Sequence, residues 1–422
     1  MSAAAPPPIP VHEVAAPALN EGASGSQLLS RLFERCEEIG VSDIQMRSDR
    51  FVYVETNKGM RCLEELGVFS RENVTDVYRA LILNRESTSH GFGEAKQVDQ
   101  RTEAKVREAF EKIRTTHVDD FACSGVPIGA SGKVSGRLRI QVHLSASGLG
   151  ITCRILNDGI PELEILGIDP DTLESLRRSV QRRAGLCLVT GPTGSGKSTT
   201  LASLIDWLRR NHAKHIVTVE DPVEYQYPHD MKDPAGGQQT FPAPSVVTQQ
   251  EVGRDLDSYR QGLKDVLRKA PHVILVGEIR DREAMDTCLE AAQTGHLVLS
   301  TLHTTGAVKT MGRILEMYPA DRQQAVLNRL GEMLVFIMSQ GLLKGVDRRV
   351  LTYEFLQNDD DTASSSIVNY IKGKQALEDV IRRTGNVEWD TNLRNLLRQG
   401  LISEEVFENT RMNRSQSDEM AM

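Results

Sequence analysis

The feature that most constrains the fold of this chain is a glycine-rich turn in residues 185–210, GLCLVTGPTGSGKSTTLASLIDWLRR. The apolar run before the turn predicts a buried strand, and the run after it predicts a helix. Between them, Gly191, Gly196, Lys197 and Ser198 match the spacing of a phosphate-binding loop. A flexible turn of glycine and serine is the alternative, and the flanking strand and helix disfavour it.

The chemistry of such a loop follows from its backbone. Glycines let the chain wrap a phosphate with its N–H groups facing inward, and a helix N-terminus attracts negative charge. Lys197 is expected to reach the β- and γ-phosphates, and the Ser198 hydroxyl to bind Mg²⁺. The residues expected to contact the nucleotide are Gly191, Pro192, Thr193, Gly194, Ser195, Gly196, Lys197, Ser198 and Thr199.

A second apolar run ends in a carboxylate, which a phosphate-transferring site needs near its metal. Residues 272–281, HVILVGEIRD, place Glu278 shortly after four apolar residues, with Asp281 three positions later. An aspartate is usual at this point, so a glutamate suggests Mg²⁺ held through water or a glutamate that polarises the attacking water. A capping or surface carboxylate is the alternative.

A third apolar run ends in three acids. Residues 218–226, TVEDPVEYQ, contain Glu220, Asp221 and Glu224. A helix cap accounts for one of them. Three acids beside a phosphate site repel one another, so at least one is expected to hold a metal or a water and take part in the chemistry.

Strand-like and helix-like segments alternate in the second half of the chain, which indicates an α/β fold with a doubly wound, mainly parallel sheet. The expected strands are 186–190, 215–220, 272–277 and 296–302. In residues 27–158, some segments have the apolar spacing of a helix and others that of a strand, which predicts an α+β domain. The expected divisions are a disordered Ala/Pro-rich tail at 1–26, the α+β domain at 27–158, a linker at 159–180, the nucleotide-binding domain at 181–346, a helical segment at 347–410 and a disordered tail at 411–422.

Charge and cysteine content narrow the class of protein. The formal net charge is −8, which gives no general attraction to nucleic acid or anionic lipid. The six cysteines are scattered singly, so neither a zinc site nor a disulfide framework is expected. A protein of a reducing compartment is expected instead. No window approaches the roughly 20 apolar residues of a spanning helix, and no secretory signal is visible. A cytoplasmic protein is expected.

Residues 294–305, TGHLVLSTLHTT, place two histidines seven positions apart around an apolar run. For a lone histidine in such a place, a satisfied structural role is the more common one. Periodicity does not decide between that role and a functional one.

Taken in order, four segments resemble motifs of the secretion ATPase superfamily. They are GPTGSGKSTTL (Walker A), VEDPVEY (Asp box), EVGRDLDSYRQGLKDVLRKAPHVILVGEIRDREA (Walker B) and TGHLVLSTLHTTGA (His box). This superfamily includes the PilT-type twitching-motility motors, the GspE-type type II secretion ATPases, and the ATPases of conjugation and type IV secretion. With VSDIQM, GRLRIQV and CRIL in the first domain, the likeness covers about residues 40–408. It implies a PAS-like first domain, a RecA-like P-loop domain, and ATP with Mg²⁺ as cofactors.

The resemblance also implies roles for individual residues. Glu224 matches the general base for water, Glu278 the Walker B acid, and His296 and His303 the His box, which senses the nucleotide state and links subunits. His303 is expected to be functional, whereas His296 could be structural. The other expected site residues are Glu220, Asp221, Arg280, Arg137, Arg139 and Arg154.

The last three, Arg137, Arg139 and Arg154, match family arginines that reach the nucleotide from the first domain, and solvated surface arginines are the alternative. A positioned arginine stabilises the charge of phosphoryl transfer by about 10³–10⁵ in rate. The resemblance further implies a homo-hexamer whose two domains move against each other. It also implies docking on inner-membrane components of a secretion or conjugation apparatus, with peripheral association through those partners.

Three departures bear on the branch of the superfamily. The four-cysteine zinc element of the GspE type has no counterpart here. The PilT-type signature AIRNLIR aligns with SIVNYIK at 366–372, where Val368 and Lys372 replace its arginines. The insertion at 228–245, PHDMKDPAGGQQTFPAPS, is longer than the compact PilT-type loop. These features favour the DotB/TraJ-type ATPases of type IVB secretion and plasmid conjugation, with a type IV pilus motor as the alternative.

Other classes of protein explain less of the sequence. A small-molecule kinase would need an acceptor lid and would not need Glu224, Glu278 and His303 together. A RecA-like nucleic-acid motor would be expected to carry a basic, aromatic-bearing loop, which the charge of −8 does not support. Direct sequence-specific nucleic-acid binding is therefore not expected. A nucleotide-binding module without hydrolysis would not need Glu224 or Glu278.

Overall fold

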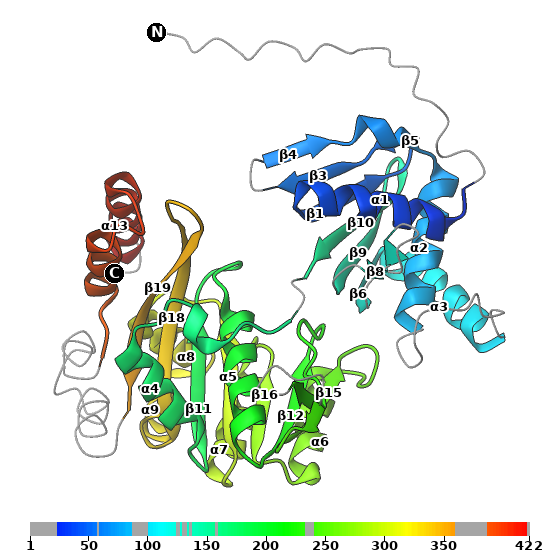
Figure 1. The fold of residues 1–422 in the computed structure, drawn as a ribbon. Helices are drawn as coiled ribbons and strands as arrows, with labels where there is room; N and C mark the ends of the chain where they lie inside the picture. The colour runs from blue at the N-terminus through cyan, green and yellow to red at the C-terminus, as the bar shows by residue number, and fades with distance from the viewer. Residues whose placement is uncertain are drawn as a thin grey trace. The chain divides into compact units, whose positions relative to one another are not determined.

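The computed structural model describes residues 23–56, 59–86, 100–123, 127–128, 133–134, 137–156, 159–232, 240–358 and 386–419. The signature at 366–372 and residues 233–239 of the insertion lie outside these ranges. The chain forms two compact units, Met1–Asp158 and Gly159–Met422 (Figure 1). Each has its own hydrophobic core. No helix among the described residues is long and apolar enough to cross a membrane.

The first unit is built on a six-stranded antiparallel sheet in the order β4-β3-β1-β10-β9-β6. These strands are β1 (Val41–Arg47), β3 (Tyr53–Thr56), β4 (Gly59–Cys62), β6 (Val118–Cys123), β9 (Leu138–Ser145) and β10 (Gly148–Ile155). The helices are α1 (Gly25–Ile39), α2 (Arg71–Glu86), α3 (Gln100–Thr116) and the short η1 (Glu64–Leu66). Two small ribbons pair β2 (Arg50–Phe51) with β5 (Val68–Phe69) and β7 (Pro127–Ile128) with β8 (Lys133–Val134).

The spacing of apolar residues along the sequence accounts for this α+β architecture. Helix α1 begins at Ser24, whose hydroxyl accepts from the N–H of Gln27 in a capping box, and ends at Gly40 with φ 67°. Along β1, Ile44 and Met46 are buried and their neighbours are not. One face of the sheet therefore packs with the helices, and the other carries polar side chains.

Asp119 ties β6 to two helices of the first unit. Its side chain is 2% exposed and accepts from Tyr78 Oη at 2.8 Å and from Lys112 Nζ at 2.7 Å. We expect Asp119→Ala to lower the free energy of unfolding of this unit by about 1–3 kcal/mol, because buried polar groups lose their partner. Urea denaturation checks this, with the exposed neighbour changed in Asp120→Ala as the control. Equal destabilisation by both variants would contradict the prediction.

The second unit is an α/β domain with a seven-stranded sheet in the order β15-β12-β16-β17-β11-β18-β19. Every neighbouring pair is parallel except β18 with β19. The strands are β11 (Gly185–Thr190), β12 (His215–Glu220), β15 (Val246–Glu251), β16 (Val273–Val276), β17 (Leu297–Leu302), β18 (Leu334–Lys344) and β19 (Arg349–Gln357). A hairpin of β13 (Asp230–Lys232) and β14 (Thr240–Pro242) lies within the insertion. The mainly parallel α/β sheet is confirmed.

Helices cover both faces of this sheet (Figure 1). On one face lie η3 (Leu163–Ile165), α4 (Pro170–Val180) and α5 (Lys197–Asn211). On the other lie α6 (Tyr259–Val266), α7 (Arg282–Gln293), α8 (Ala307–Glu316) and α9 (Ala320–Met333), with the short η4 (Leu267–Lys269) after α6. The C-terminal segment adds α12 (Trp389–Arg398) and α13 (Glu404–Glu419).

Three expected boundaries differ from the structure. The stretch expected as a linker, 159–180, contains α4, whose apolar side joins the core of the second unit. The expected helical segment from 347 begins with β19, a buried strand that pairs with β18. Residues 411–419, expected in a disordered tail, continue α13. In the first two stretches, short apolar runs do not by themselves distinguish a strand from a helix, and packing decides between them.

Candidate functional site

The glycine-rich turn lies between β11 and α5, as expected for a phosphate-binding loop. Gly191, Gly194 and Gly196 have φ of 146°, 78° and 87°, conformations that favour glycine. A Cβ at Gly191 would lie 2.2 Å from the backbone oxygen of Gln340 on β18. The loop therefore curls tightly against β18 and only glycine fits at its start.

Lys197 lies folded over this loop. Its side chain is 7% exposed, and Nζ donates to the carbonyl oxygens of Gly191 and Pro192 at 2.9 Å each. Burial lowers the pKa of the ammonium, and the negative charges of Glu278 and Glu224 oppose that shift. Both carboxylates thus lie within electrostatic reach of the lysine that would meet a phosphate.

The order of the strands brings the other motifs to the same edge. Strand β17 lies between β11 and β16, and β12 lies beyond β16. Because all four strands are parallel, the residues that follow them meet at the carboxyl edge of the sheet, where α/β proteins bind ligands. The phosphate-binding loop, the Asp box, Glu278 and His303 therefore share one edge.

Polar and charged side chains at this edge form a continuous chain of contacts. Glu278 Oε1 lies 3.4 Å from His303 Nε2, and Glu278 Oε2 accepts from Arg280 Nε at 3.0 Å. Arg280 Nη1 then lies 3.5 Å from Asp221 Oδ2. The Arg280 guanidinium also lies 5.7 Å from the ring centroid of Tyr259, within cation–π range. Arg280 and His303 thus contact Glu278 on its two oxygens.

The acids of the Asp box have different environments. Glu220 Oε1 accepts from Thr218 Oγ1 at 2.7 Å and lies 3.3 Å from Gln249 Nε2 on β15. Glu224 instead precedes Tyr225, whose hydroxyl lies 2.8 Å from Thr199 Oγ1 of α5. This contact holds the end of the Asp box against the start of the loop's helix. Glu220 is occupied by neighbours on the sheet, and Glu224 is the acid beside the loop.

Sequence reasoning missed a buried acid that shapes the Asp box. Glu251, at the end of β15, is 1% exposed, and its Oε2 accepts from the N–H of Val223 at 3.1 Å. It lies opposite Glu220 in the parallel register. Glu251 opens the segment that resembles Walker B, but its contact with the Asp box was not predicted, because the strand pairing that creates it joins Glu220 and Glu251, 31 residues apart.

The two histidines lie at opposite ends of β17. His303 follows the strand and contacts Glu278, whereas His296 precedes it and its Nδ1 lies 3.0 Å from the carbonyl oxygen of Ala291 at the end of α7. Six strand residues separate them, a span of about 20 Å. The structure therefore brings His303 to the site and leaves His296 on the far edge.

Replacing each histidine in turn tests whether only the one beside Glu278 affects catalysis. We expect His303→Ala to lower kcat for ATP by about tenfold, because Glu278 loses the polar neighbour that contacts its Oε1. His296→Ala is expected to keep kcat and to lower the melting temperature, because only the end of α7 loses a contact. Steady-state ATPase assays and thermal unfolding measure both. A larger catalytic loss in His296→Ala would contradict the assignment.

The expected arginines lie in the first unit. Arg139 and Arg154 are exposed and are direct cross-strand partners on β9 and β10, whereas Arg137 is half-buried and immediately precedes β9. Arg154 Nε lies 2.7 Å from Asp43 Oδ1 on β1.

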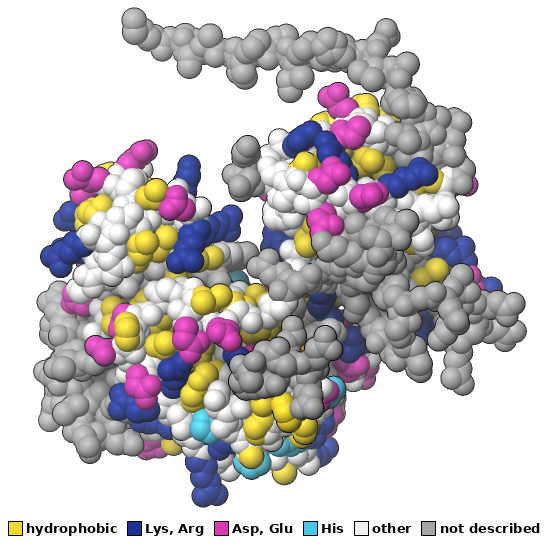
Figure 2. Space-filling model, viewed as in Figure 1, with side chains coloured by type: hydrophobic (Ala, Val, Ile, Leu, Met, Phe, Trp, Pro, Cys, Tyr) yellow, Lys and Arg dark blue, Asp and Glu magenta, His cyan; other side chains and the backbone are white. Residues whose placement is uncertain are grey.

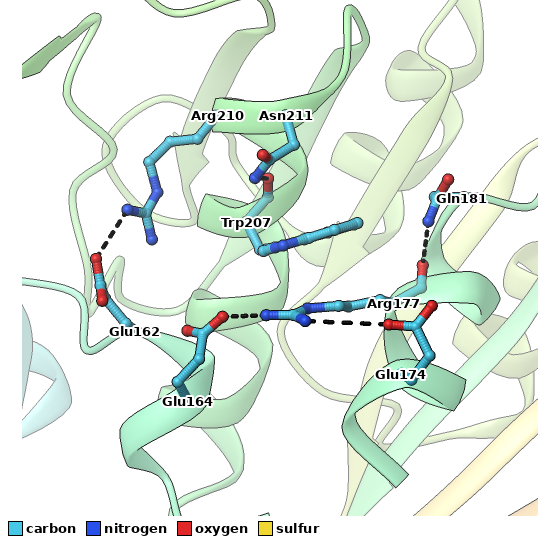
Figure 3. Close-up of a pocket in the computed structure, with 8 residues that line it drawn as sticks. All are labelled: Glu162, Glu164, Glu174, Arg177, Gln181, Trp207, Arg210 and Asn211. Atoms are coloured by element: carbon cyan, nitrogen blue, oxygen red, sulfur yellow. Dashed lines mark hydrogen bonds and ion pairs between the residues drawn. The ribbon is translucent and has the colours of Figure 1, made fainter. Parts of the chain in front are cut away.

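A surface hollow of about 450 Å³ lies elsewhere on the second unit, between η3, α4 and α5 (Figure 3). Its charged side chains pair with one another: Arg177 contacts Glu164 and lies 4.0 Å from Glu174, and Arg210 lies 3.1 Å from Glu162. Arg210 is 13 residues beyond Lys197, about 20 Å along α5. The hollow is separate from the phosphate-binding loop.

Residues 95–412 match the family model for the type II/IV secretion system protein, which is more than half of the 422 residues. The chain belongs to this family of secretion ATPases. It is an ATPase of the PilT/GspE superfamily, as the motifs predicted.

Relatives of this secretion ATPase include pilus proteins. A twitching motility protein of Neisseria gonorrhoeae is 36% identical over 277 residues, or 64% of this chain and 68% of that protein. The type IV pilus retraction ATPase PilT of Pseudomonas aeruginosa is 36% identical over 307 residues, or 71% of this chain and 80% of that protein.

Solved structures resemble the secretion ATPase over both units. The pilus retraction motor PilT with bound ADP matches with a TM-score of 0.69 and 31% identity, over 89% of this chain and 94% of that chain. The Legionella pneumophila ATPase DotB matches with a TM-score of 0.69 and 24% identity, over 90% and 94%. The DotB likeness concerns the fold alone.

Proposed function

We propose that this secretion ATPase is a homo-hexamer that hydrolyses ATP with Mg²⁺ to power a type IV, IVB-like secretion or conjugative transfer apparatus. The observation that carries the enzymatic part is the grouping of Lys197, Glu278, His303 and the Glu224 segment at one sheet edge. The branch is supported by the insertion at 228–245 and the altered signature at 366–372.

Each residue at the edge has a distinct task in hydrolysis. Lys197 would leave the Gly191 and Pro192 carbonyls to bind the β- and γ-phosphates. Glu224 would accept a proton from water as the water oxygen bonds to the γ-phosphorus and the bond to ADP breaks, leaving ADP and phosphate. The exposed Ser198 hydroxyl and the half-buried Glu278 are oxygen donors of the kind that suits Mg²⁺. The ion would supply charge neutralisation for the phosphates.

The side chains around Glu278 suit a sensor of nucleotide state. Arg280 and His303 contact its two oxygens, and Arg280 also reaches Asp221. A magnesium nucleotide that competes for Glu278 would release these side chains. Arg137, Arg139 and Arg154 are proposed to add positive charge from the first unit, in which Arg139 and Arg154 are exposed cross-strand partners.

We propose a cytoplasmic ring associated with the inner membrane through partner proteins. On the face drawn in Figure 2, Lys and Arg are interspersed with Asp and Glu over the described residues. This mixture and the net charge of −8 suit docking on proteins more than binding along a nucleic acid.

A pilus retraction or assembly motor is the second candidate, and the 36% identity to PilT of Pseudomonas aeruginosa favours it. One experiment decides between the two. Glu224→Gln is expressed in the native host, crosslinked with ATP present, and the co-purifying proteins are identified by mass spectrometry. Components of a secretion or conjugation core would support the proposal. A pilus platform protein with pilins would instead establish the second candidate.

A further inference from the structure

Gln340, on β18, is a buried glutamine that touches the phosphate-binding loop. Its side chain is 1% exposed, and Nε2 donates to the carbonyl oxygen of Ser195 at 2.8 Å. Strand β18 pairs with β11 up to Thr190 opposite Ser339, so Gln340 lies directly beside the point where the loop begins. It is 145 residues from Ser195 and belongs to none of the four motifs.

The loop and Gln340 are in close contact at two places. A Cβ at Gly191 would lie 2.2 Å from the Gln340 backbone oxygen, and a Cβ at Gly196 would lie 3.2 Å from Gln340 Nε2. The glutamine therefore forms the wall behind both ends of the loop. Its side-chain amide contacts the peptide between Ser195 and Gly196.

Stability alone does not account for a glutamine at this position. Gln340 Oε1 is buried and has no hydrogen-bond partner among the described residues, and neither has the nearby Ser195 Oγ. A buried amide that satisfies only one end is less favourable than an apolar side chain of similar volume. The bond that Gln340 does make, to the loop carbonyl, is thus the part that calls for a glutamine.

That bond has a geometric consequence for phosphate binding. In a planar trans peptide the C=O and the following N–H point in opposite directions. Holding the Ser195 carbonyl toward Gln340 therefore turns the Gly196 N–H away from the wall, and the N–H groups of such a loop are the ones that cradle phosphate. We propose that Gln340 is a positioning residue that aims the Gly196 N–H at the nucleotide phosphates.

The test uses the full-length ATPase with Gln340→Met, which keeps the side-chain length and removes the amide. Gln357→Met, at a buried glutamine on β19 away from the loop, is the matched control. Gln340→Asn, which retains an amide one methylene too short to reach, serves if the methionine variant does not fold. The measurements are KM and kcat for ATP, the inhibition constant of pyrophosphate as a probe without base or ribose, and the melting temperature.

We expect KM for ATP and the inhibition constant of pyrophosphate to rise together by about tenfold, because one charge-assisted hydrogen bond to phosphate is misaligned. The Gln357→Met control should keep wild-type values of both. A folded Gln340 variant with unchanged KM would overturn the inference, as would a loss of kcat alone. A rise in KM without a rise for pyrophosphate would place Gln340 at the base or ribose and overturn it too. The inference rests on ATP hydrolysis and not on which apparatus the enzyme drives.

Discussion

Glu224→Gln is expected to lower kcat for ATP by about 10²–10⁴-fold while nucleotide affinity stays close to wild type. A decrease in kcat of this size is typical of the loss of a general base. Affinity is preserved because Lys197 and the loop backbone, which hold the phosphates, are left intact. Glu224 is the acid of the Asp box whose neighbour Tyr225 lies against Thr199 of α5, and its charge acts on Lys197. Single-turnover hydrolysis and equilibrium binding of a fluorescent ATP analogue separate the two effects.

Glu220→Gln is the comparison for this variant, since it makes the same chemical change four residues earlier. Glu220 is held by Thr218 and Gln249 on the sheet, so its replacement should reduce kcat far less. If Glu224→Gln hydrolysed ATP at the wild-type rate, Glu224 would not be the base. If both variants lost activity equally, the difference in environment between the two acids would have no catalytic meaning.

Lys197→Ala is expected to weaken nucleotide binding by roughly 10²-fold or more. Removing one member of a buried charge pair costs about 2–5 kcal/mol, and each 1.4 kcal/mol is tenfold in affinity. Isothermal titration with ADP measures the change. Lys264→Ala, at an exposed lysine of α6 that lies 4.0 Å from Glu283, is the control and should bind as wild type does.

The same lysine predicts a pH dependence of binding. Burial lowers the pKa of Lys197 below its ordinary value in the free protein. The ammonium therefore loses its proton at a lower pH than an exposed lysine, and affinity for ADP should fall as the pH rises through that pKa. Phosphate binding favours the charged form, so the bound state resists this loss. A titration in Lys197→Ala with the same pH dependence as wild type would contradict this account.

Short stretches of the sequence were enough to predict the phosphate-binding loop, the alternating strands and helices, and the acidic residues of the site. The loop is recognisable because its function depends on consecutive residues: glycines with positive φ at 191, 194 and 196, and a lysine that starts α5. The strands around it are apolar runs bounded by polar residues, which a period of hydrophobicity reveals. The α/β fold and the ATPase family followed from these features.

The sequence did not separate strand from helix where burial is complete. In β19, eight of the nine residues are buried, and only its antiparallel pairing with β18 makes it part of the sheet. The structure of residues 159–180, expected as a linker, was also not predicted. Helix α4 forms there because its apolar side meets the core of the second unit. There Tyr353 of β19 also hydrogen-bonds Asp169, the residue that caps α4.

By itself, the sequence determined which residue types are available for ATP hydrolysis and which segments carry them. The tertiary structure decided which of them meet. It placed His303 at Glu278 and His296 about 20 Å away, held Glu220 on the sheet beside Gln249, and brought Gln340 to the loop. The physical reason is that these contacts depend on the order of parallel strands, which joins residues far apart along the chain and leaves no local pattern.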